Sequence, residues 1–301
     1  MNIPEKRPIT DWLPVSREEL DRRGWDEVDV IIVSGDAYVD HPSFGHAVMG
    51  RLIEKEGFRV AVLPQPNWRD DLRDFKKLGR PRLFFGVTAG CMDSMVNHYT
   101  ANKRLRSDDA YTPGGIAGFR PDYASVVYTG ILKKLFPDVP VILGGIEASM
   151  RRLTHYDYWS DSLKPDILTW SGADMLVFGM GEKAIVALLQ RLAAGEPIHQ
   201  IRDLEQTAFK VPADELLPEM PGVNTLELPS HVQCKADKKA FARHFRIFEE
   251  ESNRWQGARL IEPNGDTVTV INPANPPMEE KEIDAAFDLP YTRQPHPRYN
   301  K

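Results

Sequence analysis

Cysteine is scarce in this chain, which has only two among its 301 residues, Cys91 and Cys234. Two thiols cannot supply the four ligands of a structural zinc site, nor can they hold an iron–sulfur cluster by themselves. The first residues, MNIPEKRPITDWLP, lack the apolar core of a secretory leader. We therefore expect a cytoplasmic protein whose two thiols are free rather than joined in a disulfide.

Long apolar runs and an excess of positive charge are also missing. No stretch approaches the ~20 apolar residues of a membrane-spanning helix, so no membrane partner is expected. The formal net charge of -6 argues against a general nucleic-acid binder, although it leaves room for a local basic patch. With 42% hydrophobic and 27% charged residues, the composition is that of an ordinary globular chain of one or two domains.

Short apolar segments alternate with helical patterns between residues 28 and 194. The segments are apolar on both faces, as buried parallel strands are. This alternation predicts an α/β fold, a doubly wound parallel five-stranded sheet with the flavodoxin-like order 2-1-3-4-5 and right-handed crossovers. The expected strands are residues 28–34, 58–63, 82–87, 140–143 and 174–178, and the expected helices are residues 44–56, 70–78, 125–136 and 183–194.

Three regions follow from this pattern: an N-terminal arm at 1–27 with a short helix at 16–23, a main domain at 28–204, and a smaller α+β connector at 205–301. The main domain is expected to end in an edge strand at 201–204. The connector is expected to contain a charged helix at 236–253, a hairpin at 259–272, a helix at 278–287 and a proline-containing tail without a packing partner.

Two insertions, residues 88–120 and 148–170, leave the carboxyl ends of the third and fourth expected strands. Long irregular insertions in a compact domain are usually functional, and open α/β sheets bind ligands at the carboxyl ends of their strands. Glycines there permit close approach of a ligand to the backbone. The candidate ligand-binding residues at this edge are Asp36, His41, Gly144, Gly145, Glu147 and Gly181.

Each candidate also has a structural interpretation. Asp36 can brace its own turn, His41 can simply be exposed, and the double glycine can serve a tight turn. Glu182, beside Gly181, would repel a phosphate and is expected to cap its helix. A third interpretation, a hydrolase using Asp36, Asp40, His41 and Glu147, lacks the spacing of a catalytic triad.

The two insertions carry further polar residues. In RRLTHYDYWSD, arginines and aromatic rings could bind a planar polar group, but pairing of Arg151 or Arg152 with Asp157 or Asp161 is favoured. The cations Lys103, Arg104 and Arg106 could contact phosphate or RNA. A salt-bridge set with Asp108 and Asp109 is the favoured interpretation. Cys91 has no evident base nearby and is interpreted as a buried thiol.

Three long motifs closely resemble the YgiQ-type radical SAM proteins. They are GCMDSMVNHYTANKRLRSDDAYTPGG, PDYASVVYTGILKKLFPDVPVILGGIEASMRRLTHYDYWSD and ADMLVFGMGEKAIVALL, and the ending LPYTRQPHPRY is similar as well. The resemblance covers most of residues 10–301. It implies an N-terminal domain like the cobalamin-binding domains of other radical SAM enzymes, followed by a radical SAM barrel.

In that family, a Cys-x-x-x-Cys-x-x-Cys loop of the barrel holds a [4Fe–4S] cluster, which binds and cleaves S-adenosylmethionine. The family's substrate, a small molecule or a macromolecule, is not established. This chain has no such cysteine triplet and stops at Lys301. The resemblance therefore implies an N-terminal module that is inactive alone, with no cofactor or metal of its own. Its partner is a barrel supplied downstream or by a separate chain.

Cobalamin is a further cofactor of such domains. Some of them supply a histidine to cobalt from an Asp-x-His-x-x-Gly pattern, but here Asp40 and His41 are adjacent and Gly45 lies four residues beyond His41. The spacing fails, so weak or no corrinoid binding is predicted. The alternative function is a stand-alone ligand-binding module of flavodoxin-like shape without redox chemistry.

Overall fold

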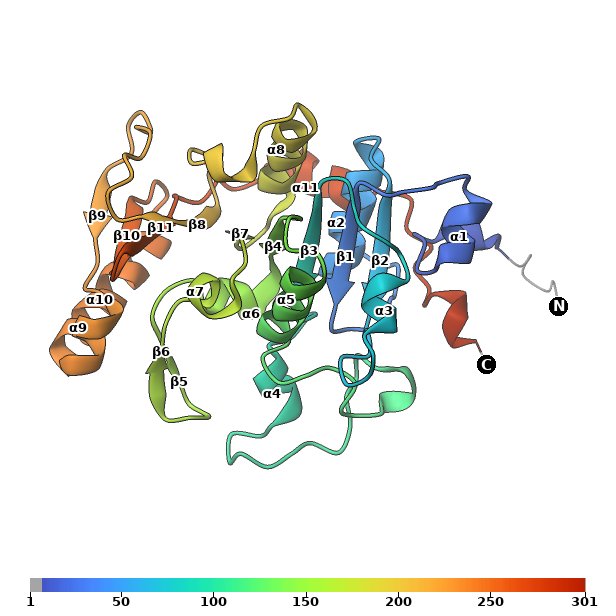
Figure 1. The fold of residues 1–301 in the computed structure, drawn as a ribbon, viewed down its shortest axis with the longest axis horizontal. Helices are drawn as coiled ribbons and strands as arrows, with labels where there is room; N and C mark the ends of the chain where they lie inside the picture. The colour runs from blue at the N-terminus through green and yellow to red at the C-terminus, as the bar shows by residue number, and fades with distance from the viewer. Residues whose placement is uncertain (1–6, 301) are drawn as a thin grey trace.

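A nine-stranded sheet forms the centre of the protein in the computed structural model, which describes residues 7–300 (Figure 1). Five of its strands are parallel and lie in the predicted order, β2-β1-β3-β4-β7. They are β1 (Val30–Ser34), β2 (Val60–Pro64), β3 (Phe84–Thr88), β4 (Val141–Leu143) and β7 (Met175–Val177). The α/β class and the order of these five strands are confirmed.

The expected total of five strands is wrong, because the connector adds four strands to the same sheet. They are β8 (Thr207–Pro212), β9 (Thr225–Glu227), β10 (Arg259–Asn264) and β11 (Thr267–Ile271). β8 pairs antiparallel with β7, and β11, β10 and β9 follow in that order, which makes the sheet mixed. The apolar edge of β7 is thereby covered rather than left open. Residues 201–204 form no strand; the sheet resumes at Thr207.

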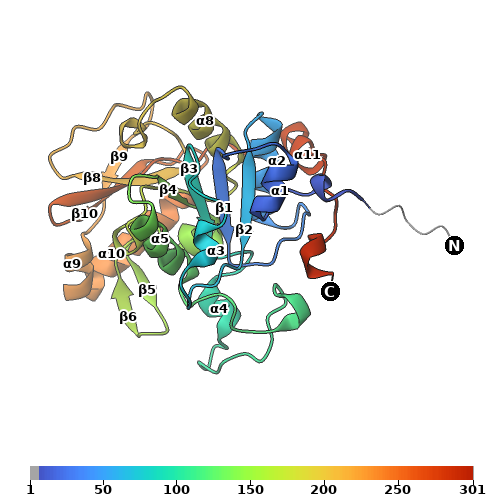
Figure 2. The same cartoon turned by 45° about the vertical axis from the view of Figure 1, so that its right-hand side comes forward.

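Helices cover both faces of the sheet, and the strand residues alternate between the two layers. Val30 and Ile32 of β1 pack in the core under α2 (Gly45–Lys55) and α8 (Glu182–Ala193). Ile31 and Val33 pack in the opposite core. That second layer contains α3 (Arg73–Lys76), α5 (Ala124–Leu135) and α7 (Ile167–Ser171), seen in front of the sheet in Figures 1 and 2. The sheet is therefore buried on both faces, as its apolar strands require.

Both predicted insertions leave the carboxyl edge of the sheet. The first contains α4 (Ser94–His98) and the short 3-10 helix η2 (Pro113–Gly115), and it hangs below the sheet in Figure 1. The second contains α6 (Gly145–Met150) and a hairpin of β5 (His155–Asp157) and β6 (Ser162–Lys164). They surround the edge at which the candidate site was expected.

The remaining elements belong to the N-terminal arm, to the end of the main domain and to the connector. η1 (Ile9–Asp11) and α1 (Arg17–Arg22) belong to the N-terminal arm, and η3 (Ile198–Gln200) follows α8. The remaining helices of the connector are α9 (His231–Ala236), α10 (Lys238–Ser252), α11 (Glu280–Phe287) and η4 (Pro297–Tyr299). Among them, α11 packs against α2.

The C-terminal tail, expected to lack a packing partner, instead packs against the loop after β1. His296 is fully buried, and its backbone N–H donates to the carbonyl of Tyr38 (3.0 Å). The N–H of Tyr38 donates in turn to the hydroxyl of Tyr299 (3.0 Å), and the N–H of Thr292 donates to Asp40 Oδ2 (2.8 Å). The expectation failed because the partner lies about 250 residues away in sequence, where local patterns give no sign of it.

Candidate ligand-binding cleft

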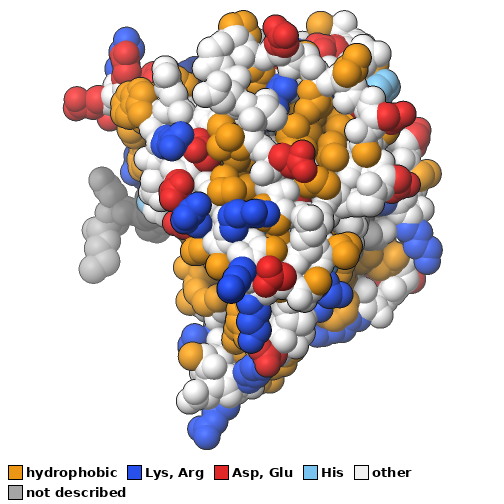
Figure 3. Space-filling view, turned by 90° about the vertical axis from the view of Figure 1, so that its left-hand side faces the viewer, with side chains coloured by type: hydrophobic (Ala, Val, Ile, Leu, Met, Phe, Trp, Pro, Cys, Tyr) orange, Lys and Arg blue, Asp and Glu red, His pale blue; other side chains and the backbone are white. Residues whose placement is uncertain are grey.

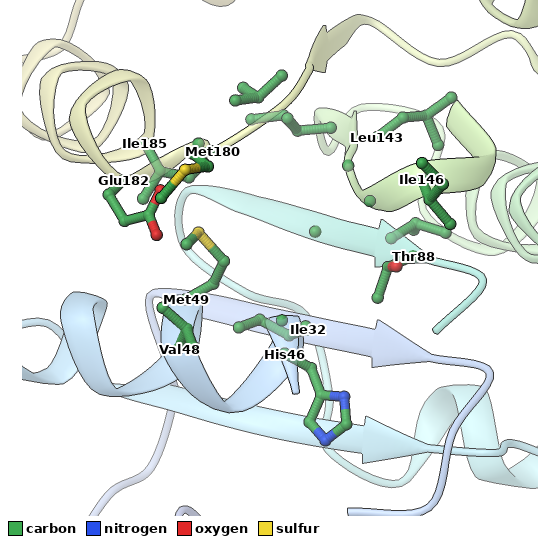
Figure 4. Close-up of a pocket in the computed structure, with 18 of the residues that line it drawn as sticks. Ile32, His46, Val48, Met49, Thr88, Leu143, Ile146, Met180, Glu182 and Ile185 are labelled. Atoms are coloured by element: carbon green, nitrogen blue, oxygen red, sulfur yellow. The ribbon is translucent and has the colours of Figure 1, made fainter. Parts of the chain in front are cut away.

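A cleft of about 390 Å³ lies at the carboxyl ends of β1, β3, β4 and β7, between α2 and α8. Its walls are mostly apolar. Met49 of α2 and Ile185 of α8 face one another across it, while Ile32 lies at the floor (Figure 4). Thr88 and Ile146 lie at the end where β3 and α6 meet (Figure 4). Concave, mainly apolar sites with a few polar groups are the usual form of small-molecule sites.

Glycines shape this cleft. Gly86 in the middle of β3 leaves the floor without a side chain. Gly145 has φ +80°, and a Cβ there would lie 2.4 Å from Thr88 Oγ1. A Cβ on Gly181 would lie 2.9 Å from Val177 Cγ1. The starts of α6 and α8 therefore approach the strands more closely than any larger residue permits.

Three helices begin at the border of the cleft. Their N-cap residues, Phe44 for α2, Gly144 for α6 and Gly181 for α8, make no side-chain capping bond. By contrast, Ser16, Asp93, Asp166, Ser230 and Asp237 cap other helices. The first backbone N–H groups of the three helices thus receive no hydrogen bond from the side chains of their own N-cap residues.

Two polar side chains stand out within the apolar lining, on opposite sides of it (Figure 4). The Nδ1 atom of His46 lies 3.1 Å from Ser34 Oγ, but its buried Nε2 atom has no partner in the described part of the chain. Burial lowers the pKa of His46 to about 4, so the ring is neutral at pH 7. The Oε2 atom of Glu182 is likewise buried without a partner among residues 7–300, and the predicted capping bond from Glu182 is not formed.

Cys91 also lines the cleft, half-buried rather than buried as predicted. Its Sγ lies 3.6 Å from the carbonyl of Ser43. Burial and the nearby Asp36 raise its pKa to about 12, which keeps the group a neutral thiol. A thiol in that state is a poor nucleophile, in agreement with its interpretation as a structural residue.

Of the six predicted site residues, Gly144, Gly145 and Gly181 line the cleft, and the three others do not. Asp36 is fully buried beside it. Its Oδ2 accepts from the N–H of Cys91 (2.7 Å), and its Oδ1 lies 2.8 Å from the Arg120 guanidinium. Burial raises the pKa of Asp36. This side chain therefore anchors the first insertion to the sheet.

Glu147 and His41 are also placed outside the cleft. Glu147 is buried, and it accepts hydrogen bonds from the N–H of Ser94 (2.8 Å) and the N–H of Ser125 (2.9 Å). It thereby ties together the starts of α4 and α5. The Nδ1 atom of His41 accepts from the N–H of Ser43 (3.1 Å) in its own turn.

The hydrolase interpretation finds no support in this arrangement. Asp40 forms a buried ion pair with Arg51 at 2.5 Å. Asp36, Asp40, His41 and Glu147 are held in separate hydrogen-bond sets, and no nucleophile–base pair is formed among them. Two further predicted pairings are wrong as well. Arg151 pairs with Asp93, and Asp109 pairs with Arg120, not with the nearby cations of its own insertion.

Residues 7–300 contain no group of three or more His, Cys, Asp or Glu side chains arranged to hold a metal ion. None of the helices in this range combines the length and the apolar character that crossing a bilayer requires.

Comparison with known proteins identifies the class. The model of the family described as "Radical SAM N-terminal" matches residues 12–301. The chain belongs to this family, and the resemblance noted in the sequence is confirmed.

Curated relatives match over nearly the whole chain. A UPF0313 protein of Porphyromonas gingivalis is 61% identical over 297 residues, covering 99% of this chain and 46% of its own length. The UPF0313 protein YgiQ of Escherichia coli is 45% identical over 340 residues, covering 96% of this chain and 46% of its own length. The chain therefore spans about half the length of the curated relatives it matches.

A solved structure with a weaker likeness is that of TsrM from Kitasatospora setae, a radical S-adenosylmethionine methyltransferase with tryptophan and a SAM analogue bound. It is 16% identical, with a TM-score of 0.39, and the match covers 67% of this chain and 38% of the other.

Proposed function

We propose that this chain is the ligand-holding N-terminal module of a YgiQ-type radical SAM protein. It has a flavodoxin-like sheet similar to those of cobalamin-binding domains, and it presents its ligand to a radical SAM barrel. The observation that carries the proposal is the apolar cleft between α2 and α8, at the edge where open α/β sheets bind ligands.

The lining defines the chemistry of the ligand. Most of the ligand is apolar, because the cleft is lined by Ile32, Met49, Ile146 and Ile185. The ligand carries a hydrogen-bonding group that pairs with Glu182 Oε2, since leaving a buried polar atom unpaired costs about 1–3 kcal/mol. A dianionic phosphate beside Glu182 would be repelled.

The iron–sulfur cluster does not fit this chain. Cys91 lies in the first insertion and Cys234 on α9, and no third cysteine is present. The [4Fe–4S] cluster and S-adenosylmethionine are therefore assigned to the barrel, supplied downstream or by a separate chain. No radical step is attributed to the residues described here.

Corrinoid binding through a histidine–cobalt bond does not fit either. His41 does not line the cleft, and His46 is 2% exposed with its ring packed against Tyr38 and Phe44. We propose weak or no corrinoid binding. Incubation with hydroxocobalamin followed by gel filtration should leave the protein without a visible corrinoid spectrum, and a stoichiometric spectrum would contradict the proposal.

Ligand binding in the cleft can be tested with a variant whose larger side chain fills the space. Titration with the apolar fluorescent probe 8-anilinonaphthalene-1-sulfonate should give a saturable fluorescence increase. The variant Met49→Trp should reduce this signal at least about tenfold, because the indole fills the space between α2 and α8. Leu216→Trp, at a position 94% exposed, is the control and should bind the probe as the parent does. Equal binding by all three proteins would remove the cleft as a site.

The second candidate, a stand-alone binding module, rests on the same apolar cleft between α2 and α8, which needs no redox group to hold a ligand. The coding sequence beyond Lys301 separates the two. A Cys-x-x-x-Cys-x-x-Cys triplet encoded soon after Lys301 supports the radical SAM module, whereas a stop codon there supports the stand-alone module.

A further inference from the structure

Positive charge is concentrated in part of the connector-helix pair α9 and α10, residues 235–246, ahead of the carboxylates Glu249, Glu250 and Glu251 near the end of α10. Residues 235–246 contain five cations and one carboxylate, Asp237. Lys239, Arg243 and Arg246 recur at the spacing i, i+4, i+7, which places them on one face of α10. All five cationic side chains are exposed: Lys235, Lys238, Lys239, Arg243 and Arg246.

These charges are mostly not neutralised by the protein. Among the ion pairs of residues 7–300, only Arg246 of the five has a carboxylate within 4.0 Å, Glu250 at 3.6 Å, and that pair is exposed. The inward side of the helix pair is fixed by buried contacts such as His244 Nε2 with Glu262 (2.6 Å). The cationic face is therefore presented by a firmly packed helix.

A second basic cluster lies at the tip of the first insertion. Lys103, Arg104 and Arg106 are exposed and form no ion pair within the part of the chain that the structure describes. Lys103 Nζ donates to the carbonyl of Trp159 (2.7 Å), and Arg106 Nε donates to the carbonyl of Val96 (3.2 Å). These bonds orient two of the side chains without cancelling their charge.

The β5–β6 hairpin joins the two clusters. α9 packs against β6, and Tyr99 at the base of the insertion tip stacks on Trp159 of the hairpin at 4.0 Å between ring centroids. Lys164 of β6 adds a further cation. Figure 3, which views this side of the molecule, shows lysine and arginine side chains descending from its middle toward the projecting lower end.

Two exposed aromatic rings lie on the same elements, Phe245 on α10 beside the cationic face and Tyr156 on β5, where its hydroxyl donates to Asp161 Oδ1 (2.6 Å). Phe245 is 53% exposed and Tyr156 54% exposed, which is unusual for rings that a core could have used. Aromatic rings near a track of cations are features that bind single-stranded nucleic acid, where bases stack on aromatic faces and phosphates meet the charges. The hydroxyl of Ser160 on the same hairpin donates to Asp157 Oδ2 (2.5 Å) and bonds Ser162 Oγ (2.7 Å), so the two serine oxygens remain as acceptors for a ribose 2′-hydroxyl.

We propose that the surface formed by α9, α10, the β5–β6 hairpin and the insertion tip binds single-stranded RNA. This surface is separate from the cleft between α2 and α8, and the inference does not depend on a ligand in that cleft. An anionic bilayer is the less suitable partner. Of the three phenylalanines on one side of α10, Phe248 packs against the core and Phe241 is half-buried, which leaves only Phe245 exposed for insertion.

The test is fluorescence anisotropy of a labelled 20-nucleotide single-stranded RNA with the 301-residue chain at several salt concentrations. The double variant Lys239→Gln/Arg243→Gln should weaken binding at least about tenfold. It should also make the plot of the logarithm of the association constant against the logarithm of the salt concentration less steep. The expected decrease in steepness is about 1.4, since each of the two lost phosphate contacts contributes ~0.7 for single strands. Glutamine keeps the helix propensity, so folding should be preserved, as circular dichroism would verify.

The matched control is Lys55→Gln/Arg59→Gln, which removes the same charge from exposed positions at the α2–β2 end of the sheet. It should change affinity less than about twofold. Absence of RNA binding at about 100 µM chain and moderate salt would overturn the proposal, as would equal losses in both double variants. Tighter binding to phosphatidylserine vesicles or to single-stranded DNA than to RNA would overturn it as well.

Discussion

Arg120 has almost no exposed side-chain surface, yet it carries a positive charge beneath the loops of the carboxyl edge. Its guanidinium lies 2.8 Å from Asp36 and 3.1 Å from Asp109, and Nη1 donates to the carbonyl of Ala89 (2.9 Å). One cation thus holds the first insertion against β1 and β3. The residues that bracket the insertion are fixed by electrostatics rather than by apolar packing.

Removing that cation leaves two carboxylates buried without it. We expect Arg120→Gln to lower the free energy of unfolding by ~3–5 kcal/mol, measured by urea denaturation. Arg73→Gln is the control, because its ion pair with Asp71 is exposed on both sides and should be worth less than ~1 kcal/mol. A small loss for Arg120→Gln would show that water reaches the two carboxylates.

His46 predicts a pH dependence. Its folded pKa, lowered by burial to about 4, is below the ordinary unfolded value, so the unfolded chain binds the proton more tightly. The stability that this histidine contributes is present above the unfolded pKa and is lost as pH falls toward 4. Between pH 7 and pH 5 the loss is about 2 kcal/mol.

The variant His46→Asn keeps a polar group near Ser34 but does not titrate in this range. Urea denaturation at pH 7 and pH 5 should therefore show a smaller pH dependence for this variant by about 2 kcal/mol. The comparison separates the contribution of His46 from that of Asp36. Because the pKa of Asp36 is raised in the folded state, Asp36 makes the protein more stable as the pH falls, which is opposite to the effect of His46. An identical pH dependence in both proteins would mean that the ring is solvated.

Three glycines of the cleft were predicted from sequence, whereas Gly86 and His46 were not. Gly144, Gly145 and Gly181 were identifiable because each follows a predicted strand, where a residue without a Cβ serves a turn or a close approach. The only sequence feature that pointed to His46 was its position in the first turn of the helix that follows the first strand and its loop. This feature is weak, and the neighbouring His41 in the loop is more conspicuous. Whether a buried nitrogen is paired depends on side chains brought together only by folding.

At the scale of elements, the start of α6 depends on close backbone approach to β3. We expect Gly145→Ala to destabilise the protein by ~1–3 kcal/mol more than Gly57→Ala. Both glycines have positive φ, but a Cβ on Gly57 meets nothing within 4 Å, whereas on Gly145 it would lie 2.4 Å from Thr88 Oγ1. Thermal denaturation of the two variants measures the difference, and equal values would show that Thr88 moves aside freely.

The parallel strands were predictable from sequence because their apolar runs are continuous, whereas the strands after residue 204 were not placed. The 259–272 hairpin was expected, as its Pro-Asn-Gly-Asp turn is explicit, and β10 and β11 confirm it. Nothing local indicates that β11 pairs with β8, or that β8 pairs with β7. Those pairings join segments with independent sequence patterns, so only the folded chain reveals them.

At the scale of the whole molecule, one sheet spans both the predicted main domain and the predicted connector. Ala208, Leu260 and Ile271 are buried in the same core as β1 and β3, and Phe209 and Val270 are buried in the other. The boundary at residue 204 stays a prediction. The shared cores indicate that the two parts fold together.

A truncated chain that ends at residue 204 tests whether the main domain and the connector fold together. It would expose the edge of β7 and the apolar surface that β8 and β11 cover, so we expect aggregation or loss of cooperative unfolding. Size-exclusion chromatography and thermal denaturation measure the outcome. A chain beginning at residue 7 is the control and should behave as the parent. A monomeric, cooperatively unfolding 1–204 fragment would establish that the boundary separates independent domains.

The return of residues 292–299 to Tyr38 and Asp40 has a consequence for tethering. Any polypeptide joined after the carboxyl-terminal residues 292–299, natural or engineered, starts near the loop that follows β1, on the side of the sheet where α1 lies in Figure 1. A short linker would hold such a passenger at a high effective concentration near the loop that follows β1, raising the frequency of encounter without any new contact.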